Sequence, residues 1–529
     1  MELAGCRTVM IRWSSKALSS ECSMRTIGES ICSRLLAAAQ IKLTGLGFKT
    51  AWLICVLAGS VLVGSFAPFG YWPLSLISLV AFCAVSTGFK GHRLAALHYG
   101  FALGLFGAGV AWIYVSIHTY GGASSLLAGG LTGLFILLWS LTFIPQGYVL
   151  SYLRDRGGWP NAPWMAMTWV LGEWFRGWFL TGFPWLYVGY AHTGTWAGHW
   201  APIGGVLLVG FVVVLLAELL VRQWRAPNHW IPVVVTGLFA LSFSVGSLEF
   251  VDRAGSLKVA GIQANLDQHT KWQPEQFLSN LNAHTRLMVD LPEVDLVVWS
   301  EASFTRFAHQ GQASLQQLKD WADAAGVGLI VGLPRADETG FYNTVQGLGL
   351  AEGRYLKRHL VPFGEFVPMA SVLRGLIQFF DLPMSRNQPG PAVQAPIRLG
   401  AHELSLSICY EITDAELVRG TAQDPALLIT VSNDTWFGAS IGPEQHLQIA
   451  AMRAAELARS VVRVTNNGVT ALISNKGDVL ARLPKDEPGV MVQSVPLFTG
   501  QTPYSRFGQS PIIALLLGFM AASLIWNRL

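Results

Sequence analysis

LSLSICYE, residues 404–411, is the stretch around which the rest of the chain can be understood. Apolar residues alternate with small ones from Leu404 to Ile408, which predicts a buried strand that ends at Cys409. A thiol at the end of a strand is well placed to react. The chain has six cysteines, and Cys409 is alone in the polar segment between residues 250 and 505, so it has no disulfide or zinc-ligand partner there. Buried cysteines are commonly inert small hydrophobic residues, and the residues described below are what favour a nucleophile.

The composition indicates a membrane protein. The chain has 529 residues, of which 52% are hydrophobic and only 13% are charged. Soluble domains average roughly 25% charged residues, so a large part of this chain is expected to lie in a lipid bilayer. The formal net charge of +4 is small for this length, and no basic tract carries interleaved aromatic residues. These features exclude a nucleic-acid-binding protein.

Long apolar runs, separated by turn residues and charged loops, predict eight membrane-spanning helices. The expected helices lie near residues 50–66, 72–88, 95–117, 125–150, 163–181, 202–221, 231–247 and 511–526. One of them carries Glu173 and Arg176, three residues apart. Because charges are costly inside a bilayer, we expect these two side chains to form an ion pair that faces other helices.

The distribution of lysine and arginine predicts the orientation of these helices. Alternate loops are basic, whereas the intervening loops at 67–71, 118–124 and 182–201 contain neither residue. Basic loops stay on the cytoplasmic side, so both termini are expected in the cytoplasm and the large polar segment in the periplasm, with the protein in a bacterial inner membrane. The N-terminal tail is in part an over-long start if Met24 is the true first residue. The expected parts are a cytoplasmic tail at 1–48, a seven-helix membrane domain at 49–248, a periplasmic catalytic domain at 255–500 and the eighth helix at 507–529.

The polar segment predicts an α/β layered domain with a mixed sheet. Short apolar runs alternate with amphipathic helices over roughly 250 residues, which is typical of such layers. Three ionisable residues, Glu301, Lys357 and Cys409, stand at or just beyond the ends of expected strands. Because α/β sheets gather their active sites at strand ends, these residues are candidates for one site.

A carboxylate, an amine and a thiol together suit acyl transfer. A thiol attacks a carbonyl as the thiolate, and a carboxylate can serve as the base that removes its proton. A charged lysine can stabilise the oxyanion of the tetrahedral intermediate, together with a backbone N–H near Tyr410. Taken singly, Glu301 reads as a solvated acid and Lys357 as one charge in a basic run, so only the combination is informative.

At these residues the chain resembles the nitrilase, or carbon–nitrogen hydrolase, superfamily, and more closely the apolipoprotein N-acyltransferase family. The resemblance covers residue 46 to the end and implies an α-β-β-α sandwich after seven of eight membrane helices. It implies Glu301 as base, Lys357 as oxyanion stabiliser and Cys409 as nucleophile. The matching motifs, in order, are QANLDQHTKW at 263–272, VVWSE at 297–301, KRHLVPFGEFVP at 357–368, ICYE at 408–411 and SNDTWFG at 432–438.

The resemblance also implies supporting residues near this trio. Glu365 and Glu411 would be acids that orient Lys357 or its hydrogen bonds, and Tyr410 and Trp272 would lie beside the site. The alternative for Glu365 and Glu411 is an ordinary ion pair, for instance with Arg358 or Arg453.

The implied reaction passes an acyl chain from the sn-1 position of a phospholipid, through a Cys409 thioester, to the α-amine of a diacylglyceryl-modified apolipoprotein. Phosphatidylethanolamine is the expected donor, and no metal or other cofactor is required. An apolar insertion at 368–389 is either a lid for lipid access or packed core. The alternatives are a membrane-anchored amidase or nitrilase that hydrolyses a small C–N substrate, and a transporter with an extracytoplasmic binding domain.

Overall fold

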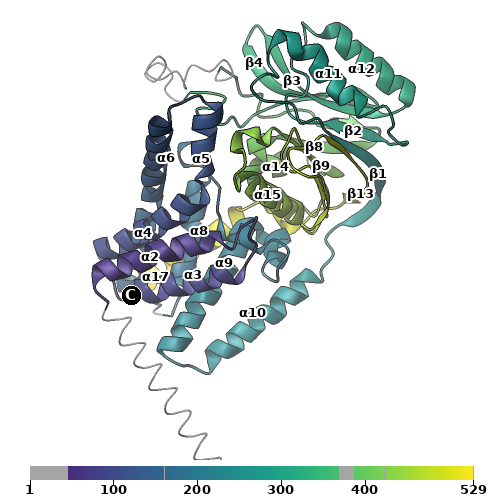
Figure 1. The fold of residues 1–529 in the computed structure, drawn as a ribbon. Coiled ribbons are helices and arrows are strands. Elements are labelled where there is room, and N and C mark those ends of the chain that lie inside the picture. Colours follow the sequence, from purple (N-terminus) through teal and green to yellow (C-terminus); the bar gives the residue numbers. More distant parts are fainter. Residues whose placement is uncertain (1–45, 160, 368–385, 422–423, 528–529) are drawn as a thin grey trace, which may run out of the picture.

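The computed structural model describes residues 46–159, 161–367, 386–421 and 424–527 (Figure 1). The predicted tail up to residue 45 and most of the apolar insertion, residues 368–385, lie outside the described residues. Figure 1 shows a group of long helices on one side of the molecule and two β-sheets on the other.

Each apolar run predicted to be helical does contain helix. The first long apolar run forms two helices around a turn that contains Pro68, as predicted. The helices are α2 (Phe48–Val63), α3 (Pro73–Ser86), α4 (Gly91–Gly109), α5 (Trp112–Val115), α6 (Ser125–Ser140), α7 (Ile144–Arg156), α8 (Trp164–Arg176), α9 (Ala201–Arg225), α10 (Trp230–Gly246) and α17 (Ser510–Trp526).

Not all of these helices are long enough to cross a bilayer. Two helical stretches, Ser125–Arg156 and Gly198–Arg225, have the length and hydropathy of a membrane span. A third is added if Gly91–Gly109 and Trp112–Tyr120, which meet at a bend of 50°, are counted as one span. The apolar helices α2, α3, α10 and α17 are shorter. The structure therefore has the apolar helices of a membrane domain, without itself fixing the number of spans.

The predicted ion pair between Glu173 and Arg176 is wrong. Both side chains are buried in α8, but the Glu173 carboxylate accepts hydrogen bonds from Trp169 Nε1 at 3.0 Å and from the backbone N–H of Val188 at 2.8 Å. The Arg176 guanidinium donates to the carbonyl oxygen of Trp185 at 3.0 Å and lies against aromatic rings. Each side chain thus has a partner in the loop that follows the helix, Val188 for Glu173 and Trp185 for Arg176, which spacing along α8 could not indicate.

The polar segment forms two mixed sheets, whereas the sequence pattern alone predicted a single mixed sheet and the resemblance implied a sandwich of two. The first has the strand order β13-β1-β2-β3-β4-β6 and the second β12-β11-β10-β9-β8-β7-β5. Neighbours β1, β2 and β3 are parallel, as are β8, β9 and β10. The first sheet contains β1 (Asp252–Gln263), β2 (Leu296–Trp299), β3 (Gly328–Asp337), β4 (Gly340–Gly349), β6 (Arg354–Leu356) and β13 (Gly489–Thr499). The second contains β5 (Ala351–Glu352), β7 (Ile397–Leu399), β8 (His402–Ile408), β9 (Leu427–Ser432), β10 (Val461–Thr465), β11 (Ala471–Ile473) and β12 (Val479–Arg482).

The sheets pack face to face and helices cover their outer faces. Along β2, Leu296 and Val298 join a cluster that also contains Leu406 and Ile408 of the second sheet. The alternate residues of β2 pack instead with Leu318 of a covering helix. Because successive side chains of a strand point to opposite faces, this alternation places four layers in the order α-β-β-α. The covering helices are α11 (Phe277–Arg286) and α12 (Gln312–Ala325) on the first sheet, and α14 (Ala415–Gly420) and α15 (Gly442–Leu457) on the second.

Helix α15 also contacts the helical bundle, where it packs on α9. The α-helical geometry of α9 is broken at Gly204 and Gly205. The N–H of Val206, freed by this break, donates to the buried Glu456 carboxylate of α15 at 2.8 Å. Glu456 is in turn paired with Arg453 at 2.7 Å. A buried polar contact therefore joins α15, which covers the second sheet, to α9 of the helical bundle.

Candidate active site

The three predicted catalytic residues follow strands of both sheets. Glu301 comes two residues after β2, Lys357 directly after β6, and Cys409 directly after β8. Strand β6 runs antiparallel to β4, which runs antiparallel to β3, so β6 ends at the same edge as β2. The site is therefore built where the strand ends of two facing sheets meet.

Glu301 is held by hydrogen-bond donors on both carboxylate oxygens. Its Oε1 accepts from Asn343 Nδ2 at 2.7 Å and lies 3.5 Å from Lys357 Nζ. Its Oε2 accepts from the backbone N–H of Asn433 at 2.8 Å. The residue is 7% exposed. Because every one of these contacts is a donor, both carboxylate oxygens act as acceptors, and the contacts fix the orientation of the carboxylate.

Lys357 lies between two carboxylates. Its Nζ is 2.8 Å from Glu365 Oε2 and 3.5 Å from Glu301 Oε1, and the side chain is almost fully buried. Burial alone would lower the pKa of Lys357, but the charges of Glu365 and Glu301 outweigh it and hold this pKa above its ordinary value. The amine is therefore a permanent ammonium at neutral pH, suited to stabilise negative charge and unsuited to act as a base.

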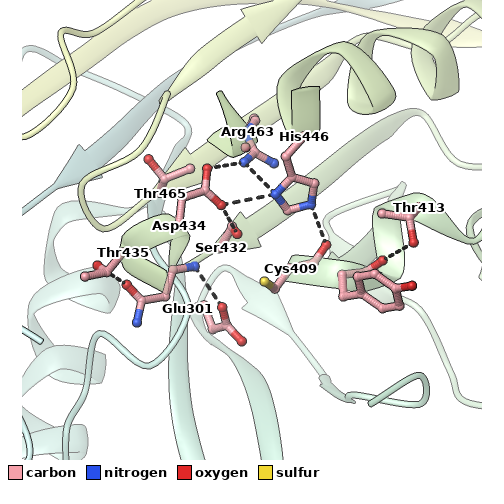
Figure 2. Close-up of polar contacts among 12 residues, drawn as sticks. Glu301, Cys409, Thr413, Ser432, Asp434, Thr435, His446, Arg463 and Thr465 are labelled. Atoms are coloured by element: carbon pink, nitrogen blue, oxygen red, sulfur yellow. Dashed lines mark hydrogen bonds and ion pairs between the residues drawn. The ribbon is translucent and has the colours of Figure 1, made fainter. Parts of the chain in front are cut away.

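Cys409 is a thiol that needs a base. Its backbone is in the left-handed region, with φ of 52°, where the strand turns into the short helix Cys409–Thr413. Burial raises the pKa of the thiol, the Glu301 carboxylate raises it further, and the Lys357 ammonium lowers it. Figure 2 shows the sulfur atom directed to the side on which Glu301 lies. A carboxylate on that side of the sulfur is the kind of group that can accept a thiol proton.

The two predicted supporting acids, Glu365 and Glu411, have different hydrogen-bond and ion-pair partners. Glu365 contacts Lys357, as predicted, and also accepts from Val361 N at 2.9 Å. Glu411 does not contact Lys357 through any described hydrogen bond or ion pair. Its buried carboxylate accepts instead from the backbone N–H groups of Arg358, at 2.6 Å, and of Ile408, at 2.8 Å. Glu411 therefore joins the backbone segments that carry Lys357 and Cys409.

Tyr410 and Trp272 also differ in their surroundings. The Tyr410 hydroxyl donates to the carbonyl oxygen of Gly182, in a loop of the helical bundle, at 3.1 Å. Trp272 is 40% exposed and has no described hydrogen bond to Glu301 or Lys357; its ring lies 5.6 Å from the Nζ of the neighbouring Lys271. Tyr410 thus links the segment that carries Cys409 to the helical bundle. The placement of Trp272 beside the site stays a prediction.

Sequence reasoning missed several residues of the site. The Asn343 side-chain amide and the backbone N–H of Asn433 hold Glu301, but neither kind of group gives a signal in a hydropathy or charge pattern. Lys271 lies in the motif at 263–272, but no role was predicted for it. Its Nζ is buried without a hydrogen-bond partner. Burial lowers the pKa of Lys271 to about 8, against the opposing effect of Glu301. Among the described residues, no three His, Cys, Asp or Glu side chains gather as a metal site.

An aromatic wall connects the site to the helical bundle. Trp185 lies 6.0 Å from Phe437 and 5.1 Å from Trp112, measured between ring centroids. Its Nε1 donates to Gln445 Oε1 at 2.7 Å, and Gln445 Nε2 donates to the carbonyl oxygen of Gly109, where α4 ends. The surroundings on this side are apolar, as the binding of an acyl chain requires.

Two family models match the chain. The model described as "Apolipoprotein N-acyltransferase N-terminal domain" matches residues 58–219, and the model described as "Carbon-nitrogen hydrolase" matches residues 258–503. A curated apolipoprotein N-acyltransferase of Pseudomonas syringae pv. tomato is 40% identical over 482 residues, covering 88% of this chain and 95% of that protein. The one from Azotobacter vinelandii is 40% identical over 497 residues, covering 90% and 95%. A solved structure, the CN-hydrolase superfamily protein XC1258 of Xanthomonas campestris, is 15% identical with a TM-score of 0.35, covering 50% of this chain and 97% of that one.

Proposed function

The chain belongs to the apolipoprotein N-acyltransferase family, and on this premise we propose that it transfers an acyl chain from the sn-1 position of a membrane phospholipid to a lipoprotein. The acceptor is the free α-amine of an N-terminal diacylglyceryl-cysteine. The acyl chain is carried between donor and acceptor as a thioester on Cys409, with Glu301 as base and Lys357 as oxyanion stabiliser.

One observation carries this assignment of roles. Lys357 contacts Glu365 at 2.8 Å and Glu301 at the longer distance of 3.5 Å. The ammonium is therefore neutralised mainly by Glu365, which leaves Glu301 free to exchange a proton with the raised-pKa thiol of Cys409. A single ion pair between Lys357 and Glu301 would instead weaken the base.

In the first half-reaction the Cys409 sulfur attacks the sn-1 carbonyl carbon and its proton passes to Glu301. The negative charge that forms on the carbonyl oxygen is stabilised by the Lys357 ammonium and the Tyr410 N–H. When the ester C–O bond breaks, Glu301 returns the proton to the glycerol oxygen. The products are the thioester and a lysophospholipid.

In the second half-reaction the α-amine of the acceptor attacks the thioester carbonyl and gives a proton to Glu301. The C–S bond breaks, the new amide leaves with the lipoprotein, and Glu301 returns the proton to the Cys409 sulfur. The aromatic side chains between the sheets and the helical bundle, including the buried Trp185, keep water from the thioester between the two steps.

The supporting residues act through this trio. Glu365 holds the Lys357 ammonium, and Glu411 joins the backbones of residues 358 and 408 through its carboxylate. The Tyr410 hydroxyl fixes the short helix Cys409–Thr413 to the loop of the helical bundle that contains Gly182. Trp272, which is partly exposed, is proposed to line the approach of a substrate.

The proposed arrangement in the membrane has eight spans, with the shorter apolar helices α2, α3, α10 and α17 crossing together with the longer ones. Both termini lie in the cytoplasm of a bacterial cell and the catalytic domain is periplasmic. The tail at 1–48, the membrane domain at 49–248, the catalytic domain at 255–500 and the last helix at 507–529 are the proposed parts. Phosphatidylethanolamine is the proposed donor, and no metal or other cofactor takes part.

Labelling of the purified enzyme tests this function. Incubation with a phospholipid that carries a radioactive sn-1 acyl chain is expected to label the wild-type enzyme, and neutral hydroxylamine is expected to release the label, as it does from a thioester. Cys409→Ala is expected to remain unlabelled, whereas Cys55→Ala, which removes a buried cysteine of α2, is expected to be labelled like wild type. A wild-type enzyme that hydrolyses small amides but takes no label would support the amidase alternative and refute the transfer.

A further inference from the structure

A fully buried histidine contacts the backbone of the nucleophile. His446, on α15, has its Nε2 3.1 Å from the carbonyl oxygen of Cys409 (Figure 2). On the other side of the ring, Nδ1 is 3.1 Å from Asp434 Oδ1 and 3.1 Å from Arg463 Nη2. Arg463 is also paired with Asp434 Oδ2 at 2.5 Å, and both of these side chains are fully buried. None of these groups has a part in the chemical steps above.

These contacts determine the tautomer of His446. A carbonyl oxygen can only accept, so Nε2 carries a hydrogen. Burial and the charge of Arg463 lower the pKa of His446, so the ring is neutral and Nδ1 is an acceptor, which takes a hydrogen from Arg463 Nη2. The remaining oxygen, Asp434 Oδ1, accepts from Ser432 Oγ at 2.7 Å. Arg463 Nη2 thus donates to both Asp434 Oδ2 and His446 Nδ1, whereas Arg463 Nε and Nη1 have no described hydrogen-bond partner.

The contact with the Cys409 carbonyl has a geometric consequence. The Cys409 C=O and the Tyr410 N–H belong to one planar peptide unit, and in a trans peptide they point in opposite directions. Fixing the carbonyl on His446 therefore fixes the direction of the Tyr410 N–H. That N–H lies in the first turn of the helix Cys409–Thr413, where backbone N–H groups have no partner inside the helix.

The backbone conformation at Cys409 makes such a restraint necessary. Its φ of 52° is in the left-handed region, which a residue other than glycine adopts only when its surroundings impose it. Rotation of this peptide would relieve the strain and turn the Tyr410 N–H away from the substrate. The hydrogen bond from His446 opposes that rotation.

We propose that His446 is a positioning residue, which holds the Cys409–Tyr410 peptide so that the Tyr410 N–H faces the oxyanion formed in both half-reactions. The inference rests on the proposed role of Cys409 as the acyl carrier. Burial and the charge of Arg463 favour the neutral imidazole against the opposing effect of Asp434, and the Cys409 carbonyl oxygen requires the hydrogen on Nε2.

A comparison of two reactions of the Cys409 sulfur, acylation and alkylation, distinguishes a role in oxyanion stabilisation from a general effect on the reactivity of the thiol. Acylation by a phospholipid forms an oxyanion, whereas alkylation by iodoacetamide displaces iodide and forms none. His446→Leu is expected to slow acyl-enzyme formation roughly 10- to 100-fold, less than the 10²- to 10³-fold typical for complete loss of an oxyanion donor. The same variant is expected to keep the rate of Cys409 alkylation within about threefold of wild type, because that reaction needs no such donor.

Two further variants complete the comparison. His446→Gln retains an N–H donor at a similar reach and is expected to recover most of the lost acylation rate. His284→Leu removes another fully buried imidazole of the same domain, which contacts Asn280 O at 2.9 Å, and is expected to slow neither reaction selectively. Parallel loss of alkylation and acylation in His446→Leu, or no recovery in His446→Gln, would overturn the inference.

A measurement on the wild-type enzyme covers the case in which His446→Leu fails to fold. With ¹⁵N-labelled histidine, and His446→Gln to assign the signal, the imidazole of His446 is expected to be neutral, with hydrogen on Nε2 and a bare Nδ1. Hydrogen on Nδ1 alone would overturn the inference. If wild type forms no thioester, the proposed function fails; if wild type and His446→Leu form it equally fast, only the role of His446 fails.

Discussion

Replacement of Glu301 by glutamine is the most informative single perturbation of the site, because it removes the proposed base with almost no change of shape. The carboxylate meets three donors: Asn343 Nδ2 at 2.7 Å, Lys357 Nζ at 3.5 Å and Asn433 N at 2.8 Å. A glutamine amide has one oxygen and one NH₂ group. In either orientation, its NH₂ group faces at least one of these donors.

Two magnitudes follow from this geometry. A buried donor left without an acceptor costs about 1 to 3 kcal/mol of stability, which would lower the melting temperature measurably. Loss of general base catalysis costs about 10²- to 10⁴-fold in rate, or about 3 to 5 kcal/mol in activation free energy. The activity loss should therefore exceed what the loss of stability explains, since enough folded enzyme remains below the melting transition.

The assay is the rate of acyl-enzyme formation from a labelled phospholipid, measured with the melting temperature of the same preparation. Glu365→Gln is expected to lose only about tenfold, because the Lys357 contact at 2.8 Å can persist as a weaker hydrogen bond to an amide oxygen. Glu403→Gln, on β8, the strand that ends just before Cys409, but in a half-exposed pair with Arg398, is the matched control and is expected to behave as wild type. If Glu301→Gln acylates within tenfold of wild type while folded, the reasoning about the base is refuted.

Three further outcomes are expected. Lys357→Met should slow acylation roughly 10²- to 10³-fold through loss of oxyanion stabilisation, with a lowered melting temperature because two carboxylates are left facing each other; unchanged acylation in this variant would argue against the role of the ammonium. Lys271→Met should stabilise the protein at pH 7 by up to about 3 kcal/mol. Burial lowers the pKa of Lys271 to about 8 in the folded state, which shows that folding costs free energy when this lysine is charged. That gain should shrink as the pH rises from 8 to 10.5, where the lysine of the unfolded chain also becomes neutral, and a gain that is constant with pH in thermal melts would contradict it. Gly332→Ala should slow acylation at least tenfold, since its Cβ would come 2.5 Å from the carbonyl oxygen of Ser300 and displace the adjacent base, whereas Gly420→Ala, with nothing within 4 Å, should have no effect on the measured rate.

Much of the site could be predicted, because a buried strand appears in the sequence as a short apolar run and the end of that run marks the end of the strand. The apolar runs before Glu301 and Cys409 set both the strand and its end, and both residues are found there. The α-β-β-α order followed from resemblance rather than from pattern. Strand β13 was not predicted, although it pairs with β1 along eleven positions from Asp252 to Gln263, because a pairing between residues so far apart in the chain has no local signal.

The missed residues share a physical cause. Asn343, Asn433 and His446 act through hydrogen bonds to partners on other strands, and nothing in their own neighbourhood in the sequence indicates those partners. The wrong ion pair in α8 has the same origin. Spacing along a helix placed Glu173 and Arg176 on one face, but the loop that folds back over that face supplies each with a nearer partner.

The most direct test of the whole account is a single-turnover chase. Enzyme carrying a labelled acyl chain on Cys409, freed of phospholipid, is mixed with a diacylglyceryl peptide that has a free α-amine. The account predicts that label leaves the enzyme and appears in the peptide as a hydroxylamine-resistant amide, in equal amount, and that a peptide with a blocked amine receives none. Label that is lost to water as free fatty acid, at the same rate with or without the acceptor, would contradict it.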